Sequence, residues 1–266
     1  METGEELKSC CASIYENDWV RLLLGDSYHP GGLALTERLG QYLELRPGVR
    51  ALDVASGRGT SALFLAEKFG CEVVGTDLSA EMTRLATHSA EEAGLSNLVT
   101  FQHGDAERLP FEDALFDAVI CECAFCTFPD KLTASREFMR VLRPGGMIGL
   151  SDLTRESDLP SELETLLAWV ACIADARSLE EYAEYLRNAG CSHVHTEPHD
   201  DVLAQMVKDI RGRLTAVQIL AGLKKVSYPG IDMAYAQTIA RAAEKGIQDG
   251  KLGYALLIGE CNANRE

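Results

Sequence analysis

The spacing of apolar residues changes repeatedly along the first part of the chain and predicts alternating strands and helices. Short apolar runs typical of buried strands recur, and segments with helical spacing separate most of them. Strands that are joined through helices pair in parallel, because a parallel connection needs a crossover. Strands are expected at 49–55, 71–77, 98–105, 114–122 and 147–153, and helices at 33–45, 60–69, 80–93 and 130–142.

This alternation fades after residue 155, where helical spacing dominates. Ser178 and Glu181 form a capping-box pattern that predicts the start of a helix. Helices are expected at 161–176, 178–190, 202–225 and 232–248, with a last strand at 251–261. Three histidines, at 193, 195 and 199, are expected in a solvated turn, with a metal site as the alternative. The predicted organisation is an arm and cap at 1–45, an open α/β core at 46–155, and helices with a final strand at 156–266 that pack on the same sheet.

The charge of the chain narrows the classes of partner. Its 266 residues include 41 Asp and Glu against 25 Lys and Arg, a formal net charge of −16. Such a surface repels phosphate backbones, so neither nucleic acid nor an anionic membrane is expected as a partner. The sequence has no apolar run of membrane-spanning length and begins without an apolar signal core, which predicts a cytoplasmic protein. The oligomeric state, monomer or homodimer, stays open.

A glycine-rich turn follows the first predicted strand. The segment DVASGRGT, residues 53–60, contains Gly57 and Gly59, which let the backbone turn sharply and approach a ligand. The helix that follows directs its first amide groups toward such a ligand. Asp77 and Asp105 end the next two strands, and ligands of open α/β sheets bind at the carboxyl ends of strands. The sequence therefore predicts a ligand site at this edge.

These segments, in order, resemble the class I S-adenosylmethionine-dependent methyltransferases. The motifs are DVASGRGT, VVGTDLS, GDAERLPFED, FDAVICE and RVLRPGG. The resemblance implies a Rossmann-like, doubly wound α/β fold with a mostly parallel seven-stranded sheet, an N-terminal helical cap and a C-terminal appendage. It also implies that Asp53 and the glycines hold the methionine part, that Asp77 binds the ribose, and that Asp105 and Ala106 meet the adenine. The expected cofactor-binding residues are His29, Gly31, Gly32, Asp53, Ala55, Gly57, Gly59, Thr60, Asp77, Leu78, Met82, Asp105, Ala106, Cys121 and Glu122.

The segment YHPGG, which contains His29, Gly31 and Gly32, has two interpretations. It is either a loop between helices with a satisfied histidine, or a cover for the carboxylate or sulfonium end of the cofactor. Related methyltransferases use a glycine-containing N-terminal segment in the second way.

Three of the nine cysteines, Cys121, Cys123 and Cys126, follow the fourth predicted strand, where this fold places the acceptor. Buried cysteines that pack like alanine are one interpretation. A zinc site is another, but zinc prefers four ligands, and only Cys123 and Cys126 have knuckle spacing.

A second resemblance, to the arsenite methyltransferases, covers CAFCTFPDK, REFMRVLRPGG, the segment around LLAWVACIADA, and YAEYLRNAGC. That family binds trivalent arsenic through cysteine thiolates. The matching positions are Cys123, Cys172 in a Trp-x-x-Cys segment, and Cys11 in the N-terminal arm, with Cys10 and Cys126 in reserve. Trivalent arsenic is a soft acceptor that suits thiolates, and its lone pair can attack the sulfonium methyl in line.

The predicted function is therefore methylation of arsenite, with glutathione or another thiol as reductant. Two alternatives stay open. One is a methyltransferase for a small organic acceptor, such as a quinone or a thiol. The other is a thiol-based metal-binding protein on the same scaffold.

Overall fold

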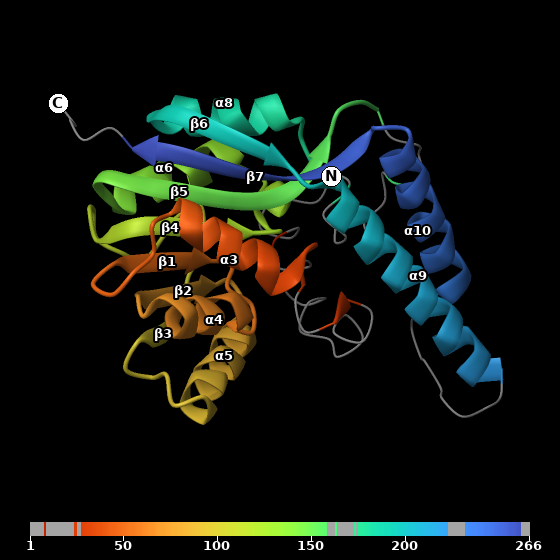
Figure 1. The fold of residues 1–266 in the computed structure, drawn as a ribbon, viewed down its shortest axis with the longest axis horizontal. Coiled ribbons are helices and arrows are strands. Elements are labelled where there is room, and N and C mark those ends of the chain that lie inside the picture. The colour runs from red at the N-terminus through yellow and green to blue at the C-terminus, as the bar shows by residue number, and fades with distance from the viewer. Residues whose placement is uncertain are drawn as a thin grey trace.

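The computed structural model describes Lys8 and residues 24–25, 28–158, 163, 173, 175–222 and 232–261. A seven-stranded sheet in the order β3-β2-β1-β4-β5-β7-β6 forms the centre of the molecule (Figure 1). Its strands are β1 Arg50–Val54, β2 Glu72–Asp77, β3 Val99–His103, β4 Phe116–Glu122, β5 Leu142–Arg155, β6 Cys191–Pro198 and β7 Leu252–Cys261. The pairs among β1 to β5 are parallel, whereas β7 is antiparallel to both of its neighbours. The seven-stranded, mostly parallel sheet is confirmed.

Helices cover both faces of this sheet. They are α3 Gly32–Tyr42, α4 Thr60–Phe69, α5 Ala80–Glu92, the short 3-10 helix η1 Phe125–Thr127, α6 Lys131–Val141, α8 Leu179–Ala189, α9 Asp200–Gly222 and α10 Met233–Gln248. Residues of α3, α4 and α5 share one buried cluster with the strands, and residues of α6 and α8 share another. The two clusters lie on opposite faces, since side chains alternate along each strand. Figure 1 shows α9 and α10 side by side as a hairpin that extends from one end of the sheet.

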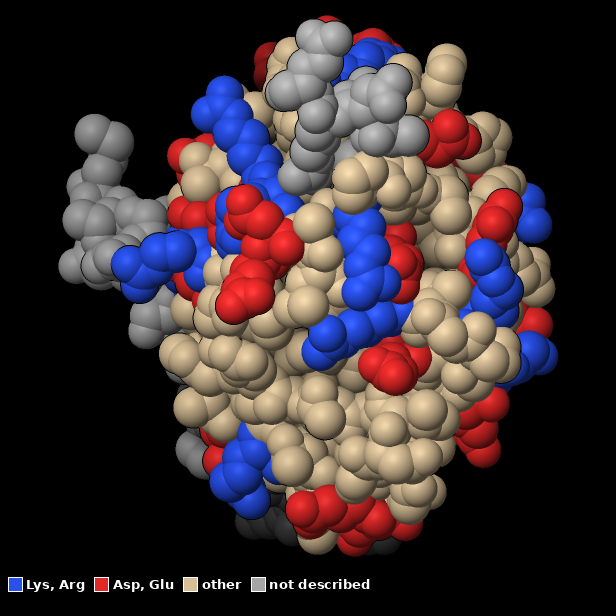
Figure 2. All heavy atoms as spheres, turned by 90° about the vertical axis from the view of Figure 1, so that its left-hand side faces the viewer, with Lys and Arg blue, Asp and Glu red and all other residues tan. Residues whose placement is uncertain are grey.

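Strand β1 pairs with β2 on one side and with β4 on the other. The order of strands reverses at this point, which leaves a crevice beyond the carboxyl ends of the central strands. The opposite face, at the amino ends of the parallel strands, is shown in Figure 2, where acidic and basic side chains lie next to one another. Arg143 and Asp117, for example, pair at 2.7 Å. In open α/β sheets, ligands bind in the crevice at the carboxyl ends of the strands.

In the C-terminal half of the chain, the predicted turn at the three histidines is wrong. Residues 191–198 form an eight-residue edge strand, β6, with His193 and His195 within it, where a solvated turn was expected. His195 lies against the ring of Tyr42, and His199 bonds Glu197. The expected helix at 161–176 lies almost entirely outside the described residues. The capping box at Ser178 is present, with the Ser178 and Glu181 side chains each accepting from the other's backbone amide.

Among the residues that the structure describes, no helix combines the length and the hydrophobicity that a membrane crossing requires.

Candidate cofactor and substrate site

The glycine turn connects β1 to α4, and its backbone adopts left-handed conformations. Gly57 has φ 52° and Gly59 has φ 79°, the region that favours glycine. A Cβ added at Gly57 would meet no atom within 4 Å, whereas one at Gly59 would collide with the ring of Phe101. Glycine is therefore required at the two positions for different reasons. Gly59 allows close packing inside the protein, and Gly57 leaves open space on the site side.

Asp77, at the end of β2, holds this turn in place. One of its carboxylate oxygens accepts from the backbone N–H of Gly57 and the other from that of Ser79, both at 2.8 Å. The Ser79 hydroxyl in turn caps α5 by accepting from the amide of Met82 at 3.0 Å. Asp77 thus links the turn to the start of α5.

Asp53, near the end of β1, is fully buried and incompletely satisfied. Its Oδ2 atom has no hydrogen-bond partner among the described residues. Burial, followed by the negative charges of Glu122 and Asp77, raises the pKa of Asp53 well above the usual range. A buried carboxylate without a partner is costly unless a donor or a cation reaches it. The orphaned oxygen and the open space at Gly57 fit a ligand that carries a positive charge, such as S-adenosylmethionine.

Glu122, at the end of β4, collects polar groups from four elements. Its carboxylate accepts from the hydroxyls of Ser61 at 2.6 Å, Thr36 at 3.1 Å and Ser151 at 3.4 Å. The imidazole Nε2 of His29 lies 3.5 Å from Oε2. The Glu122 side chain is only 4% exposed. This convergence ties the YHPGG loop and α3 to the ends of β4 and β5.

The three predicted residues of the YHPGG loop lie at the start of α3. His29 is buried and lines the cavity beside the glycine turn. Gly31 caps the start of α3, and Gly32 is its first residue. Both glycines, and His29 as well, line a neighbouring groove of about 340 Å³ that α9 also lines, whereas neither glycine lines the cavity beside the turn.

A cavity of about 150 Å³ joins these elements. It is lined by Lys8, Tyr28, His29, Ala55, Gly57, Asp77, Leu78, Met82, Glu122, Cys123, Ala124, Thr127 and Phe128. A smaller space of about 70 Å³ extends along the turn past Asp53 and Thr60. Most of the predicted cofactor residues therefore surround one continuous region at the carboxyl ends of the strands.

Asp105, the residue expected at the adenine, has a partner that the sequence did not suggest. The ammonium of Lys8 lies 2.9 Å from its Oδ2 and also pairs with Glu107. Lys8 itself lines the cavity. Neither Asp105 nor Ala106 lines it. No local pattern marks Lys8, because a single lysine in an N-terminal arm has no distinguishing spacing.

The sequence also missed several hydroxyls of the site. Thr36, Ser61 and Ser151 bond Glu122, and the Arg58 guanidinium donates to the hydroxyl of Tyr28. Thr36 lies within α3 between Leu35 and Glu37, where a threonine is unremarkable. Only the tertiary contacts identify its role.

The cysteines in and just after β4 differ in their surroundings. Cys123 has φ 53°, is partly exposed and lines the cavity. Cys121 and Cys126 are buried in the hydrophobic core, and burial raises the pKa of the Cys121 thiol well above its usual value. The thiols of Cys121 and Cys126 thus pack as core residues and do not line the cavity, contrary to a ligand role for either side chain. Cys10, Cys11 and Cys172 lie outside the described residues.

Among the described residues, no group of three or more His, Cys, Asp or Glu side chains is arranged to hold a metal ion. The knuckle spacing of Cys123 and Cys126 therefore has no further ligands beside it within this part of the chain.

Comparisons with known proteins agree with this geometry. Residues 52–150 match a family model described as a methyltransferase domain. A 27-O-demethylrifamycin SV methyltransferase of Amycolatopsis mediterranei is 30% identical over 226 residues, 84% of this chain and 81% of that one. A phosphoethanolamine N-methyltransferase of Zea mays is 33% identical over 181 residues, 67% of this chain. The match spans only 35% of the maize enzyme's length.

Solved structures share the fold at lower sequence identity. A Haemonchus contortus phosphoethanolamine N-methyltransferase 2 in complex with S-adenosylhomocysteine has a TM-score of 0.81 at 19% identity, covering 98% of this chain and 61% of that one. The [4+2]-cyclase SpnF has a TM-score of 0.74 at 22% identity and covers 99% and 98% of the two chains. Because a cyclase shares the fold, the fold by itself does not identify the reaction. The rifamycin relative, aligned over most of both chains, and the matching glycine turn do identify the family: the chain belongs to the S-adenosylmethionine-dependent methyltransferases.

Proposed function

We propose that this chain transfers a methyl group from S-adenosylmethionine to trivalent arsenic held by cysteine thiolates. The observation that carries the proposal is the position of Cys123, whose side chain lines the same cavity as Gly57, Asp77 and Glu122. Of the cysteines whose side chains the structure describes, it is the one at the cavity.

The residues around the turn have the properties that the cofactor requires. Asp53 offers an unsatisfied carboxylate oxygen to a cation, and Gly57 leaves room for close approach. Asp77 lies at the carboxyl end of β2, where an acidic group can meet ribose hydroxyls. When bound, S-adenosylmethionine supplies an electrophilic methyl group on its sulfonium.

Arsenic suits the acceptor side of the cavity for chemical reasons. Thiolates are soft ligands that select soft metalloids, and arsenic held by sulfur keeps a lone pair. Its methylation requires no deprotonation of the acceptor, so the cavity needs to position the reactants rather than supply a base. Two further thiols belong to this proposal. Cys11 follows Lys8, which lines the cavity, by three residues, and Cys172 precedes Ile173, which belongs to the same buried cluster as Cys126.

A small organic acceptor is the second candidate, and the relatives favour it. Their names describe methylation of phosphoethanolamine and of a rifamycin, which carry amine and hydroxyl acceptors. The carboxylate of Glu122 at the cavity would suit an amine or hydroxyl group that has to lose a proton.

Methyl transfer from labelled S-adenosylmethionine, with glutathione present, separates the two candidates. Arsenite, phosphoethanolamine and a quinol are offered in parallel to the wild type and to Cys123→Ala, Cys172→Ala and Cys11→Ala. Cys71→Ala is the matched control, because Cys71 is a buried thiol in the cluster on the other face of the sheet. We expect methylarsenicals from the wild type and the control, and a large loss in the three variants with S-adenosylhomocysteine binding retained.

Labelled phosphoethanolamine or quinol without methylarsenicals would replace arsenic with an organic acceptor. If the three variants form methylarsenicals as fast as the Cys71→Ala control, arsenic is not held by these thiolates.

A further inference from the structure

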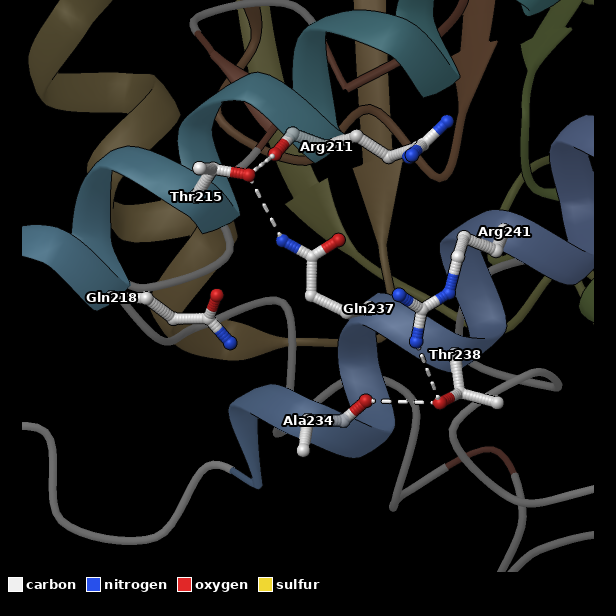
Figure 3. A pocket seen from close by; sticks show the side chains of 7 residues that line it. All are labelled: Arg211, Thr215, Gln218, Ala234, Gln237, Thr238 and Arg241. Atoms are coloured by element: carbon white, nitrogen blue, oxygen red, sulfur yellow. Dashed lines mark hydrogen bonds between the residues drawn. The ribbon is translucent and has the colours of Figure 1, made fainter.

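The α9–α10 hairpin contains a polar groove that the methyltransferase site does not use (Figure 3). Its volume is about 440 Å³, and its lining consists of Arg211, Thr215, Gln218, Ala234, Gln237, Thr238 and Arg241. None of these residues lines the cavities around the glycine turn. We propose that this groove is a second ligand site, which binds the phosphate group of a small molecule.

The polar lining arises from regular positions on the two helices. On α9, the positions 211, 215 and 218 are four and three residues apart and share one side of the helix. A separate stripe on α9, formed by Leu203, Val207, Leu214 and Val217, is buried and packs the hairpin. The groove residues of α9 are therefore distinct from its buried apolar stripe.

The donors of the groove are only partly used within the protein. The Nη1 atom of Arg211 pairs with Glu244, but its Nε atom is buried and has no hydrogen-bond partner among the described residues. The guanidinium of Arg241 contacts the hydroxyl of Thr238 at 3.4 Å and has no carboxylate partner in the described part of the chain. A buried N–H group without an acceptor is costly, and the Arg241 guanidinium at the groove offers N–H donors to an oxyanion.

The hydroxyl and amide groups between the arginines are already oriented. Figure 3 shows the Gln237 amide of α10 reaching toward Thr215 of α9, which it bonds at 3.2 Å. The Thr215 hydroxyl also donates to the carbonyl of Arg211 at 2.8 Å. These bonds join the two helices across the groove, so that the donors around them are held in place before a ligand arrives.

The charge of the lining points to an anion. No Asp or Glu lines the groove, although acidic residues outnumber basic ones by 41 to 25 in the chain. Guanidinium groups bind carboxylate and phosphate oxygens with paired N–H donors. Two guanidinium groups from two helices suit a doubly charged phosphate better than a single carboxylate. Because Glu244 offsets part of the Arg211 charge, Arg241 supplies most of the net positive charge.

Calorimetric titration with inorganic phosphate tests the proposal on protein already saturated with S-adenosylhomocysteine. Saturation keeps phosphate away from the start of α4, which is itself suited to anions. We expect one saturable phosphate site, weakened about tenfold or more by Arg241→Gln and less by Arg241→Lys. Lys245→Gln is the matched control, since it removes one charge from α10 outside the groove, and its affinity is expected to equal that of the wild type.

Three results would overturn the proposal. A heat of phosphate binding that does not saturate would show diffuse attraction to basic side chains. An equal loss of phosphate affinity in Lys245→Gln and Arg241→Gln would show the same. Succinate that binds while phosphate does not would show that the phosphate assignment is wrong. The outcome is independent of the acceptor, because the titration requires no methyl transfer. If S-adenosylhomocysteine itself fails to bind, the proposed function fails, and the phosphate titration then compares Arg241→Gln with wild type alone.

Discussion

The imidazole Nε2 of His29 lies 3.5 Å from a carboxylate oxygen of Glu122, and both side chains are at least nine-tenths buried. The other ring nitrogen, Nδ1, lies 3.2 Å from the carbonyl oxygen of Pro30. A carbonyl oxygen only accepts, so Nδ1 carries a hydrogen in this contact. The pair connects the YHPGG loop to the end of β4, and with it the loop to the cavity.

Glu122→Gln is expected to lower the free energy of unfolding by about 1–3 kcal/mol. The amide nitrogen of glutamine cannot accept, so either Ser61, which bonds Oε2, or Ser151, which bonds Oε1, would lose its acceptor. Urea unfolding measures the change. Glu91→Gln, on the exposed side of α5, is the control and is expected to stay within about 0.5 kcal/mol of the wild type. Equal midpoints for the two variants would contradict the role of Glu122 as a structural acceptor.

Alanine is expected to affect the two glycines of the turn differently. Gly57→Ala is expected to weaken S-adenosylhomocysteine binding, because its Cβ would extend into the open space of the site, and to cost about 1 kcal/mol of stability through its left-handed backbone. Gly59→Ala is expected to cost more stability than Gly57→Ala, because its backbone is also left-handed and its Cβ would collide with Phe101. Calorimetry and urea unfolding on both variants check this. A Gly57→Ala variant that binds as tightly as the wild type would show that the ligand lies elsewhere.

The buried carboxyl of Asp53 is expected to make the stability of the folded protein depend on pH. Folding raises the pKa of this carboxyl, chiefly through burial, so the folded protein holds its proton more tightly than the unfolded chain. The stability that this group contributes is complete below the unfolded pKa of about 4 and is lost as the pH rises through the folded pKa. Asp53→Asn stays neutral throughout. Urea unfolding across this range should show the wild type losing stability relative to Asp53→Asn with rising pH. Parallel curves would mean that Asp53 does not titrate in this way.

Alkylation rates should distinguish the thiols. The thiolate is the reactive form, and burial raises the pKa of the Cys71 thiol to about 11. Iodoacetamide at about pH 8 is therefore expected to modify Cys123 about tenfold or more faster than Cys71, Cys121 or Cys126. Peptide mass spectrometry follows each site, and protein unfolded in urea supplies the reference in which the rates converge. Slower alkylation of Cys123 in the presence of S-adenosylhomocysteine would place this thiol beside the cofactor. An unchanged alkylation rate would show that Cys123 lies away from the cofactor.

The elements that the sequence predicts well are those with strong local signals. Helix α4 begins at Thr60 and ends at Phe69, as expected, with left-handed glycines at both ends. Strands β1, β2 and β4 are buried runs in the centre of the sheet, and their apolar composition marks them clearly. Strand β6 was missed because it is an edge strand of mainly polar residues in which only Cys191 is buried, and pairing with β7 is what makes it a strand.

The sequence by itself determined three features: the alternation of strands and helices in the parallel part of the sheet, the glycine turn, and the acidic residues at the strand ends. Each of these features depends on neighbours within a few residues. Only the tertiary structure decided which side chains meet at the site. Lys8 reaches Asp105 across 97 positions, and Glu122 collects hydroxyls from three other elements. It also distinguished Cys123 at the cavity from Cys121 and Cys126 in the core. Contacts between distant segments depend on how helices pack across the sheet, and no local spacing encodes that arrangement.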